Sequence, residues 1–249
     1  MTNIILHGCN GRMGKAVMAA VNEDPSSQIV AGIDVLEASL PFPTYININK
    51  CTEGADVIID FSNPKATPAL LEFAKNRNIP LVLCTTGLSD SDMENVKKAA
   101  QSIAILKSAN MSLGVNLIIN LVKKATEILY DSNFDIEIIE KHHNQKIDAP
   151  SGTAMAIADA INESLDNSLE YVYDRTPLKE KRKKNQIGIH AIRGGTIVGE
   201  HEVIFAGKNE IVEISHRAMS REIFATGALK AAKFLSGKPA GFYTMNNIF

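Results

Sequence analysis

The 249-residue chain contains no tryptophan, only three cysteines and no marked excess of charge of either sign. The 26 basic and 28 acidic residues give a formal net charge of −2, so no chain-wide attraction to nucleic acid or to an anionic membrane surface is expected. Apolar runs are all shorter than the roughly 20 residues that a membrane-spanning helix needs. The N-terminus lacks a basic segment followed by an apolar stretch and a cleavage site, so secretion is not expected.

The three cysteines, Cys9, Cys51 and Cys84, have no regular spacing. An odd number without a pattern gives no disulfide framework and favours a reducing compartment, so we expect a cytoplasmic protein. The spacing also lacks the paired thiolates of a zinc site, and no metal is expected. The chain is 45% hydrophobic, which is enough apolar material for one large domain or two modest ones.

The first hundred residues alternate between strand-like and helix-like apolar patterns. Strands alternating with helices of this length predict a parallel sheet built from right-handed βαβ units. The predicted strands are residues 3–7, 28–34, 55–61, 80–85 and 102–107, and the predicted helices are residues 12–21, 64–76 and 89–100.

The pattern changes after about residue 112, where strands begin to follow one another with short turns. This succession predicts an antiparallel or mixed sheet, and therefore an α+β domain after the first α/β domain. The predicted strands are residues 135–140, 188–192, 197–206 and 210–216, and the predicted helices are residues 113–129, 153–165 and 221–235.

A glycine-rich turn, Gly8-Cys9-Asn10-Gly11-Arg12-Met13-Gly14, joins the first predicted strand to the first predicted helix. Glycines allow a tight turn and let backbone N–H groups approach a pyrophosphate, and the helix N-terminus adds unpaired donors. Asp34 ends the second predicted strand, where a carboxylate that binds the ribose is expected. A turn that merely packs a helix on a sheet is the alternative, and the order of strand, glycines, helix, strand and acid disfavours it.

The same acid bears on the choice between the two nicotinamide cofactors. Asp34 would repel a 2′-phosphate, and Val35 rather than an arginine follows it, which favours NADH. Arg12 or Lys15 could still accommodate NADPH. We therefore expect NADH, NADPH or both.

Two polar loops follow predicted strands, Cys84-Thr85-Thr86-Gly87 and Ser108-Ala109-Asn110-Met111. Ligands of open parallel sheets bind beyond the carboxyl ends of the strands, so both loops are expected at the cofactor cleft. An ordinary polar loop is the alternative in each case.

The densest polar cluster of the chain is Glu140-Lys141-His142-His143-Asn144-Gln145-Lys146-Ile147-Asp148-Ala149-Pro150-Ser151-Gly152-Thr153. A histidine can deliver a proton near neutral pH, and a lysine supplies a point charge for a carboxylate. The helix that is predicted to begin at Thr153 offers donors to an anion. A solvated polar loop is the alternative. Metal binding is disfavoured, because adjacent histidines diverge and no carboxylate or cysteine spacing completes a site.

Several segments in the same order resemble the 4-hydroxy-tetrahydrodipicolinate reductase family, and the resemblance covers essentially the whole chain. It implies an α/β fold with a Rossmann-type dinucleotide-binding domain over residues 1–112, to which residues 221–249 return. It also implies an α+β domain for substrate binding and oligomerisation, built on a mixed sheet over residues 113–220. The implied partners are a small dicarboxylate substrate and three further copies of the chain, with no nucleic acid and no membrane. The segments are residues 8–14, 84–87, 108–116, 142–153 and 193–201.

Carried over residue by residue, the resemblance makes His142 the proton donor and Lys146 the second catalytic group. His143, Gly152 and Thr153 become substrate contacts. The implied cofactor contacts are Gly8, Cys9, Asn10, Gly11, Arg12, Met13, Asp34, Cys84, Thr85, Thr86, Ser108, Ala109, Asn110 and Met111.

The reaction implied by the resemblance is the reduction of 4-hydroxy-tetrahydrodipicolinate to tetrahydrodipicolinate in lysine and diaminopimelate biosynthesis. Loss of water gives a conjugated ring, hydride adds at the former hydroxyl-bearing carbon, and His142 protonates the resulting enamine. This chain departs from the family at Cys84, where members often have glycine or alanine, and at Val35, where many have arginine. The second departure weakens the expectation of NADPH.

Other features permit different interpretations. The basic run at residues 179–184 could bind DNA in a dinucleotide-sensing regulator, but a solvated loop is favoured because no aromatic platform accompanies it. Cys84 could be the nucleophile of a semialdehyde dehydrogenase, and a sugar dehydrogenase is a further alternative. Arg193 is left unassigned. The histidines expected to be structural are His7, His190, His201 and His216.

Overall fold

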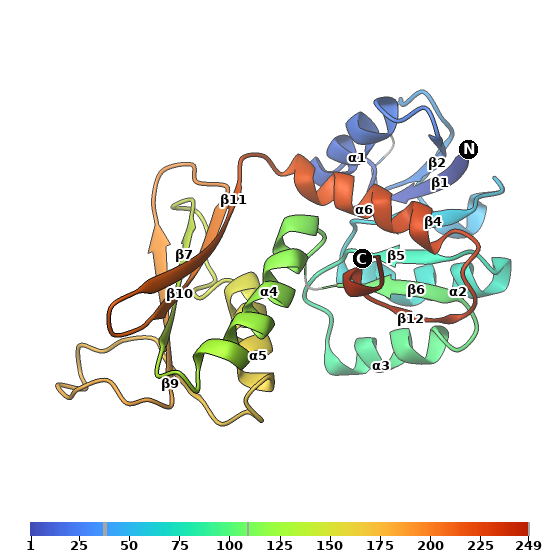
Figure 1. Ribbon diagram of the computed structural model, residues 1–249. Helices are drawn as coiled ribbons and strands as arrows, with labels where there is room; N and C mark the ends of the chain where they lie inside the picture. Colours follow the sequence, from blue (N-terminus) through green and yellow to red (C-terminus); the bar gives the residue numbers. More distant parts are fainter. Residues whose placement is uncertain (37–38, 109, 249) are drawn as a thin grey trace. The chain divides into compact units, whose positions relative to one another are not determined.

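The computed structural model describes residues 1–36, 39–108 and 110–248, and Figure 1 shows its helices and strands. The described residues divide into two compact units, Met1–Ser112 with Arg221–Phe249 and Leu113–Ser220. Within the described part of the chain, every helix is too short or too polar to cross a membrane.

The first unit is built on a parallel sheet in the order β12-β6-β5-β4-β1-β2-β3. Strands β4 and β5 are buried along their whole length and β1 from Ile4 onward, as expected for a parallel sheet that is covered on both faces. The strands are β1 (Thr2–His7), β2 (Ser27–Ile33), β3 (Thr44–Tyr45), β4 (Val57–Asp60), β5 (Leu81–Leu83), β6 (Ala104–Lys107) and β12 (Gly241–Tyr243).

Helices cover the two faces of this sheet in pairs. Helix α1 (Arg12–Asn22) packs against α6 (Glu222–Leu235), which also contacts β4, β5 and β6 (Figure 1). Helix α2 (Thr67–Arg77) packs against α3 (Asp90–Ala99), and their apolar residues share a core with alternate residues of β1, β4 and β5. The short 3₁₀ helices are η1 (Ile48–Lys50), η2 (Pro64–Ala66) and η3 (Met245–Ile248).

The second unit is built on a mixed sheet in the order β11-β10-β7-β9-β8. Strand β10 is antiparallel to β7 and β11, whereas β9 is parallel to β7 and β8. Helices α4 (Leu113–Leu129) and α5 (Gly152–Glu163) pack together on one face of it (Figure 1). The strands are β7 (Asp135–His142), β8 (Glu170–Val172), β9 (Gln186–Arg193), β10 (Gly199–Ala206) and β11 (Ile211–Ala218).

The predicted α/β fold class, with a Rossmann-type parallel sheet and a second mixed sheet, is confirmed. Strands β3, β8 and β12 were not predicted, because two or three residues are too few to show an apolar period. The predicted end of the strand at residue 140 is wrong: β7 continues to His142, because Lys141 pairs with Glu200 and His142 pairs with Arg193. His142 therefore lies on the last residue of a strand and not in a loop.

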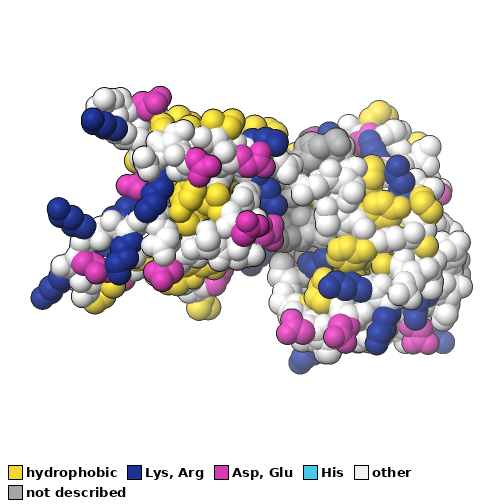
Figure 2. Space-filling view, turned by 60° about the horizontal axis from the view of Figure 1, so that its bottom comes forward, with side chains coloured by type: hydrophobic (Ala, Val, Ile, Leu, Met, Phe, Trp, Pro, Cys, Tyr) yellow, Lys and Arg dark blue, Asp and Glu magenta, His cyan; other side chains and the backbone are white. Residues whose placement is uncertain are grey.

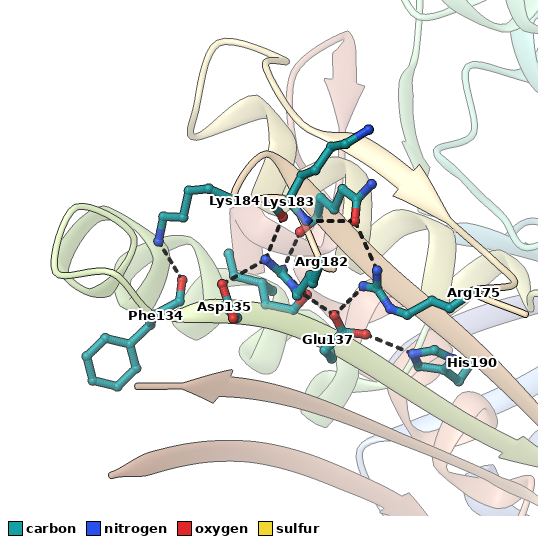
Figure 3. A network of polar contacts seen from close by, with 10 residues as sticks. Phe134, Asp135, Glu137, Arg175, Arg182, Lys183, Lys184 and His190 are labelled. Carbon is teal, nitrogen blue, oxygen red and sulfur yellow. Dashed lines mark hydrogen bonds and ion pairs between the residues drawn. The ribbon is translucent and has the colours of Figure 1, made fainter. Parts of the chain in front are cut away.

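The basic run lies in the loop between β8 and β9, and Figure 3 shows how this loop is fixed. Arg182 contacts Asp135 at 2.7 Å and Glu137 at 2.9 Å, and Arg175 reaches Glu137 at 2.6 Å. Lys184 donates to the backbone carbonyl of Phe134 at 2.9 Å. The interpretation as a solvated loop is thus wrong for Arg182, whose guanidinium ties the loop to β7.

Candidate active site

The turn between β1 and α1 is shaped by two glycines that tolerate no side chain. Gly8 has φ +84°, and a Cβ there would lie 2.6 Å from the carbonyl oxygen of Phe61. A Cβ at Gly14 would lie 2.3 Å from the carbonyl oxygen of Gly8, so α1 packs directly on the turn. Gly11 caps α1, and the first-turn N–H groups have no partner within the helix. The turn thereby presents a cradle of backbone donors suited to a pyrophosphate.

Replacing Gly8 by alanine is expected to lower the free energy of unfolding by about 2 kcal/mol, because an L-residue is strained at this φ. NADH binding should weaken about tenfold as the donors of the turn are displaced. Chemical denaturation and fluorescence titration with NADH would measure both effects. Gly54→Ala is the matched control, since a Cβ there meets nothing within 4 Å. Equal behaviour of the two variants would contradict the role assigned to this turn.

Two pockets flank the glycine turn at the carboxyl ends of the strands. The smaller has a volume of 180 Å³, and among its lining residues are the predicted Gly8, Gly11 and Asp34 together with Val35. The larger has a volume of 530 Å³. The predicted cofactor residues that line the larger pocket are Arg12, Met13, Cys84, Thr85, Thr86, Ser108, Asn110 and Met111.

The remaining predicted cofactor residues are Cys9, Asn10 and Ala109. Cys9 and Asn10 line neither pocket, because the Cys9 side chain is fully buried and the Asn10 amide donates to the carbonyl of Leu36 at 2.7 Å. The backbone N–H of Asn10 donates to Asp34 Oδ2 at 2.9 Å, so the ribose-site acid also holds the glycine turn. Ala109 lies outside the described residues.

A buried carboxylate under this cleft was not predicted. Asp60 is fully buried at the end of β4 and accepts hydrogen bonds from Ser62 Oγ and Thr85 Oγ1, each at 2.6 Å. Its Oδ1 also lies 2.8 Å from Nδ1 of His7. Lys107 completes the cluster by donating to the carbonyl of Thr85 at 2.9 Å. The strand-end rule that pointed to residues 84–87 and 108–111 also applies to β4 and would have found this position.

Sequence reasoning also missed Phe61, Ser62 and Phe224, which line the larger pocket. Phe224 comes from α6, some 110 residues further along the chain than Met111. Cys84 is only 7% exposed, and burial holds the pKa of its thiol well above the ordinary value. A thiol that stays protonated is a poor nucleophile, which argues against a semialdehyde dehydrogenase mechanism.

A second cluster of polar side chains lies in the other unit, at the end of β7. Glu140 is fully buried and receives both Nη atoms of Arg193, at 2.7 and 2.8 Å. Its Oε2 lies 2.6 Å from His142 Nδ1, and its Oε1 accepts the backbone N–H of Ser151 at 3.0 Å. This carboxylate therefore joins β7, β9 and the start of α5.

The N-terminus of α5 forms one wall of this cluster. Ser151 caps the helix by accepting the N–H of Ala154 at 3.2 Å, and its hydroxyl lies 3.1 Å from His201 Nε2. The predicted substrate contacts Gly152 and Thr153 occupy the first turn of α5. A Cβ at Gly152 would meet nothing within 4 Å, so a ligand could approach the backbone there.

The other predicted residues lie in the segment between β7 and α5. Lys146 Nζ is 2.8 Å from Asp148 Oδ1, and His143 directly follows the last residue of β7. His142, Lys146 and the start of α5 thus belong to one continuous segment of the second unit. Among the described residues, no group of three histidine, cysteine or acidic side chains is arranged to hold a metal ion.

Burial and hydrogen bonding leave the pKa values of His142, Glu140 and His201 all below their ordinary values. Burial lowers the pKa of His142, and the hydrogen bond to Glu140 opposes that shift. Burial would raise the pKa of Glu140, but hydrogen bonds from Arg193 and His142 hold it below its ordinary value. Burial and the nearby His142 lower the pKa of His201 to about 4, so His201 is neutral at pH 7 and packs its ring against His142 at 5.2 Å.

Two family models match the chain end to end: "Dihydrodipicolinate reductase, N-terminus" over residues 2–111 and "Dihydrodipicolinate reductase, C-terminus" over residues 114–249. The chain belongs to the dihydrodipicolinate reductase family. It is 55% identical over 248 residues to the 4-hydroxy-tetrahydrodipicolinate reductase of Caldanaerobacter subterraneus subsp. tengcongensis, covering 100% of this chain and 98% of that protein. The corresponding enzyme of Staphylococcus epidermidis is 47% identical, covering 99% and 100%. The predicted family is confirmed.

The fold of the chain is similar to solved structures of a dihydrodipicolinate reductase and of an inositol dehydrogenase. The dipicolinate-bound dihydrodipicolinate reductase from Paenisporosarcina sp. TG-14 matches with a TM-score of 0.83 at 24% identity, covering 100% of both chains. The apo scyllo-inositol dehydrogenase from Lactobacillus casei matches with a TM-score of 0.59 at 14% identity, covering 100% and 88%. The sugar dehydrogenase alternative thus shared the fold, and membership of the reductase family decides against it.

Proposed function

We propose that this chain catalyses the reduction of 4-hydroxy-tetrahydrodipicolinate to tetrahydrodipicolinate with NADH or NADPH, in lysine and diaminopimelate biosynthesis. The observation that carries the proposal is the His142 cluster beside the start of α5, in a chain that matches the reductase family from end to end. The first unit would bind the dinucleotide, and the second would bind the substrate and other subunits.

The residues around the glycine turn suit a dinucleotide. The first-turn amides of α1 would bind the pyrophosphate, and Asp34 would bind the adenosine ribose beside the smaller pocket. The 530 Å³ pocket between Arg12, Thr85 and Phe224 has room for the nicotinamide half. When bound, the cofactor supplies the hydride. Thr85 and Ser62 are held in place for this contact by the buried Asp60.

The substrate is a ring that bears two carboxylates, and the second unit offers two kinds of anion-binding group. Gly152 and Thr153 present first-turn N–H groups for one carboxylate. Lys146 presents an ammonium group for the other carboxylate, which would replace the exposed Asp148 as the partner of this group. His143, next to the end of β7, would complete the contacts. Orientation of the ring by these groups lowers the entropic cost of the hydride transfer.

His142 would then protonate the enamine that hydride addition leaves. Its Nδ1 is committed to Glu140, so Nε2 is the ring nitrogen that can deliver a proton. Burial lowers the pKa of the free imidazole, and a bound dianion would raise it again because opposite charge stabilises the protonated form. A bound substrate would thus favour the charged form of this acid.

The structure also bears on the DNA-binding alternative. On the face shown in Figure 2, Lys and Arg side chains are interspersed with Asp and Glu and form no continuous basic patch. Arg182, at the centre of the basic run, already pairs with Asp135 and Glu137. We therefore favour a small-molecule partner over nucleic acid.

We further propose that the protein is a cytoplasmic homotetramer that assembles through the sheet of the second unit. Helices α4 and α5 cover one face of that sheet. Strand alternation places Ile139, Ile192, Ile204 and Ile211 on the opposite face, and Ile192 and Ile211 are 46% and 62% exposed. Light scattering should give a mass four times the 27.0 kDa of one chain, and a monomer would contradict this part.

A coupled assay tests the reaction itself. The purified protein is added to the preceding synthase with pyruvate and aspartate semialdehyde, and the absorbance of NADH and of NADPH is followed in separate reactions. We expect oxidation of at least one cofactor that depends on both the synthase and its substrates. No oxidation of either cofactor, with a folded protein that binds NADH, would refute the proposed substrate.

A further inference from the structure

We propose that Glu140 is the positioning residue of this active site: its carboxylate fixes the ring of His142, and Arg193 in turn fixes the carboxylate. The inference rests on the proposed function, in which His142 donates the proton. Neither Glu140 nor Arg193 had a role in the sequence-based assignment, and they come together only in the fold, because β7 and β9 are parallel neighbours.

The contacts of Glu140 show that it acts through other groups. Its Oε2 meets His142 Nδ1 at 2.6 Å and an Nη atom of Arg193 at 2.8 Å. Its Oε1 meets the N–H of Ser151 at 3.0 Å and the second Nη atom of Arg193 at 2.7 Å. Each oxygen thus has two donors, and the side chain is fully buried. A carboxylate in this state has little capacity left to bind substrate or to accept a proton from it.

The first consequence concerns the tautomer and the direction of the His142 ring. An ionised carboxylate can only accept hydrogen bonds, so Nδ1 of His142 carries a hydrogen and Nε2 is the nitrogen that exchanges a proton with the substrate. The neighbouring position on β10 leaves room for this nitrogen: a Cβ at Gly199 would lie 3.1 Å from Nε2. Orientation by a buried acceptor is the same device that fixes metal-binding and catalytic histidines elsewhere.

The second consequence is a link between the acid and the carboxylate site. The oxygen that accepts the N–H of Ser151 holds the capping residue of α5, whose first turn contains Gly152 and Thr153. Arg193 adds a hydrogen bond to the backbone carbonyl of Asp148 at 2.7 Å. Glu140 and Arg193 therefore fix the position of the proton donor, His142. They also fix the start of α5, against which one substrate carboxylate would lie.

Charged and titratable groups surround His142 from several elements. Glu140 lies on the same strand, Arg193 on β9, Lys146 in the following segment, and His201 on β10. The charges of Arg193 and Lys146 disfavour the protonated imidazole, whereas that of Glu140 favours it. Removal of the Glu140 charge should therefore lower the pKa of His142. A general acid works only when protonated, so kcat/KM declines as pH rises through its pKa, and this decline should move to lower pH.

The experiment uses Glu140→Gln in the full-length protein, with two readouts. The titration of His142 is followed in the free protein by ¹⁵N NMR of its imidazole, and the pH profile of kcat/KM is measured with the coupled assay. We expect both the titration and the alkaline limb of the profile to move to lower pH by about one pH unit. Because kcat/KM reports the free enzyme, the two shifts should agree.

Glu137→Gln is the matched control. Glu137 lies on the same strand, also meets two arginines, and has a histidine, His190, at 2.8 Å (Figure 3). Glu137 faces the opposite side of the sheet from Glu140. Its replacement should therefore leave the pKa of His142 and the alkaline limb of the kcat/KM profile unchanged. Glu140→Asp keeps the negative charge on a side chain that is one methylene shorter. It should shift the His142 titration less than Glu140→Gln does, and it should lower the plateau of the kcat/KM profile.

The readouts separate this inference from the function on which it rests. An unchanged titration of His142 in Glu140→Gln would overturn the positioning role, whatever the kinetics show. A shifted titration with an unmoved pH limb would support the positioning role and refute His142 as the proton donor. If the glutamine variant does not fold, Glu140→Asp decides by the same criteria: a shifted titration with a reduced plateau rate supports the inference, and wild-type behaviour overturns it.

Discussion

Replacing His142 by glutamine is expected to lower kcat by about 10²- to 10⁴-fold, the contribution that general acid catalysis makes in enzymes. Glutamine can still donate a hydrogen bond to Glu140, which lies 2.6 Å from the native ring nitrogen. It cannot deliver a proton near neutral pH. NADH affinity should stay within about twofold, because the proposed pyrophosphate and ribose contacts come from the first turn of α1 and from Asp34, not from His142.

Stopped-flow measurement of NADH oxidation and fluorescence titration of NADH binding would separate the two effects. His190→Gln is the matched control, since His190 also lies on a strand of the second unit and contacts a glutamate, Glu137, at 2.8 Å. That variant should turn over at close to the native rate. Native turnover of the His142 variant would show that another group supplies the proton.

Replacing Lys146 by alanine is expected to lower kcat/KM for the dicarboxylate substrate by about 10²-fold, with a smaller effect on kcat. A charge-assisted contact to a carboxylate contributes about 1.5–3 kcal/mol, which corresponds to this loss. In the free protein the ammonium group of Lys146 is held by Asp148 at 2.8 Å, and the partly exposed pair can open to admit an anion. NADH affinity should not change.

Calorimetric titration with dipicolinate in the presence of NADH would measure the binding part of this loss directly. Lys141→Ala controls for the removal of a nearby positive charge, because Lys141 contacts Glu200 at 3.2 Å on the other face of the sheet. The control should bind dipicolinate as the native protein does. Equal affinity of the Lys146 variant and the native protein would remove Lys146 from the substrate site.

The first unit was predictable because each of its signals is local. Strand β1, the turn from Gly8 to Gly14 and helix α1 follow one another along the chain, and the glycine spacing has one physical reason. Residues that follow strands in a parallel sheet meet at one edge, so the sequence alone could place Thr85 and Ser108 beside the larger pocket. Asp34 was predicted from its place at the end of the second strand, 20 residues after Gly14.

The parts that escaped prediction depend on contacts between distant segments. Arg193 is 53 residues from Glu140, and only the parallel pairing of β7 with β9 brings them together. Asp60 and Thr85 are 25 residues apart and meet through the order of the strands. A buried carboxylate gives no apolar period and no motif, so its role becomes visible only with its partners. His201 likewise gained its place beside His142 from the antiparallel register of β10 with β7.

The most direct test of the central claim is the fate of the transferred hydrogen. The coupled reaction is run in ordinary water with NADH that carries deuterium at its hydride-donating carbon, and the tetrahydrodipicolinate is examined by NMR and mass spectrometry. The account predicts one deuterium per product molecule, at the carbon that bore the hydroxyl group in the substrate. A product without cofactor-derived deuterium, or with deuterium at any other carbon, would contradict it.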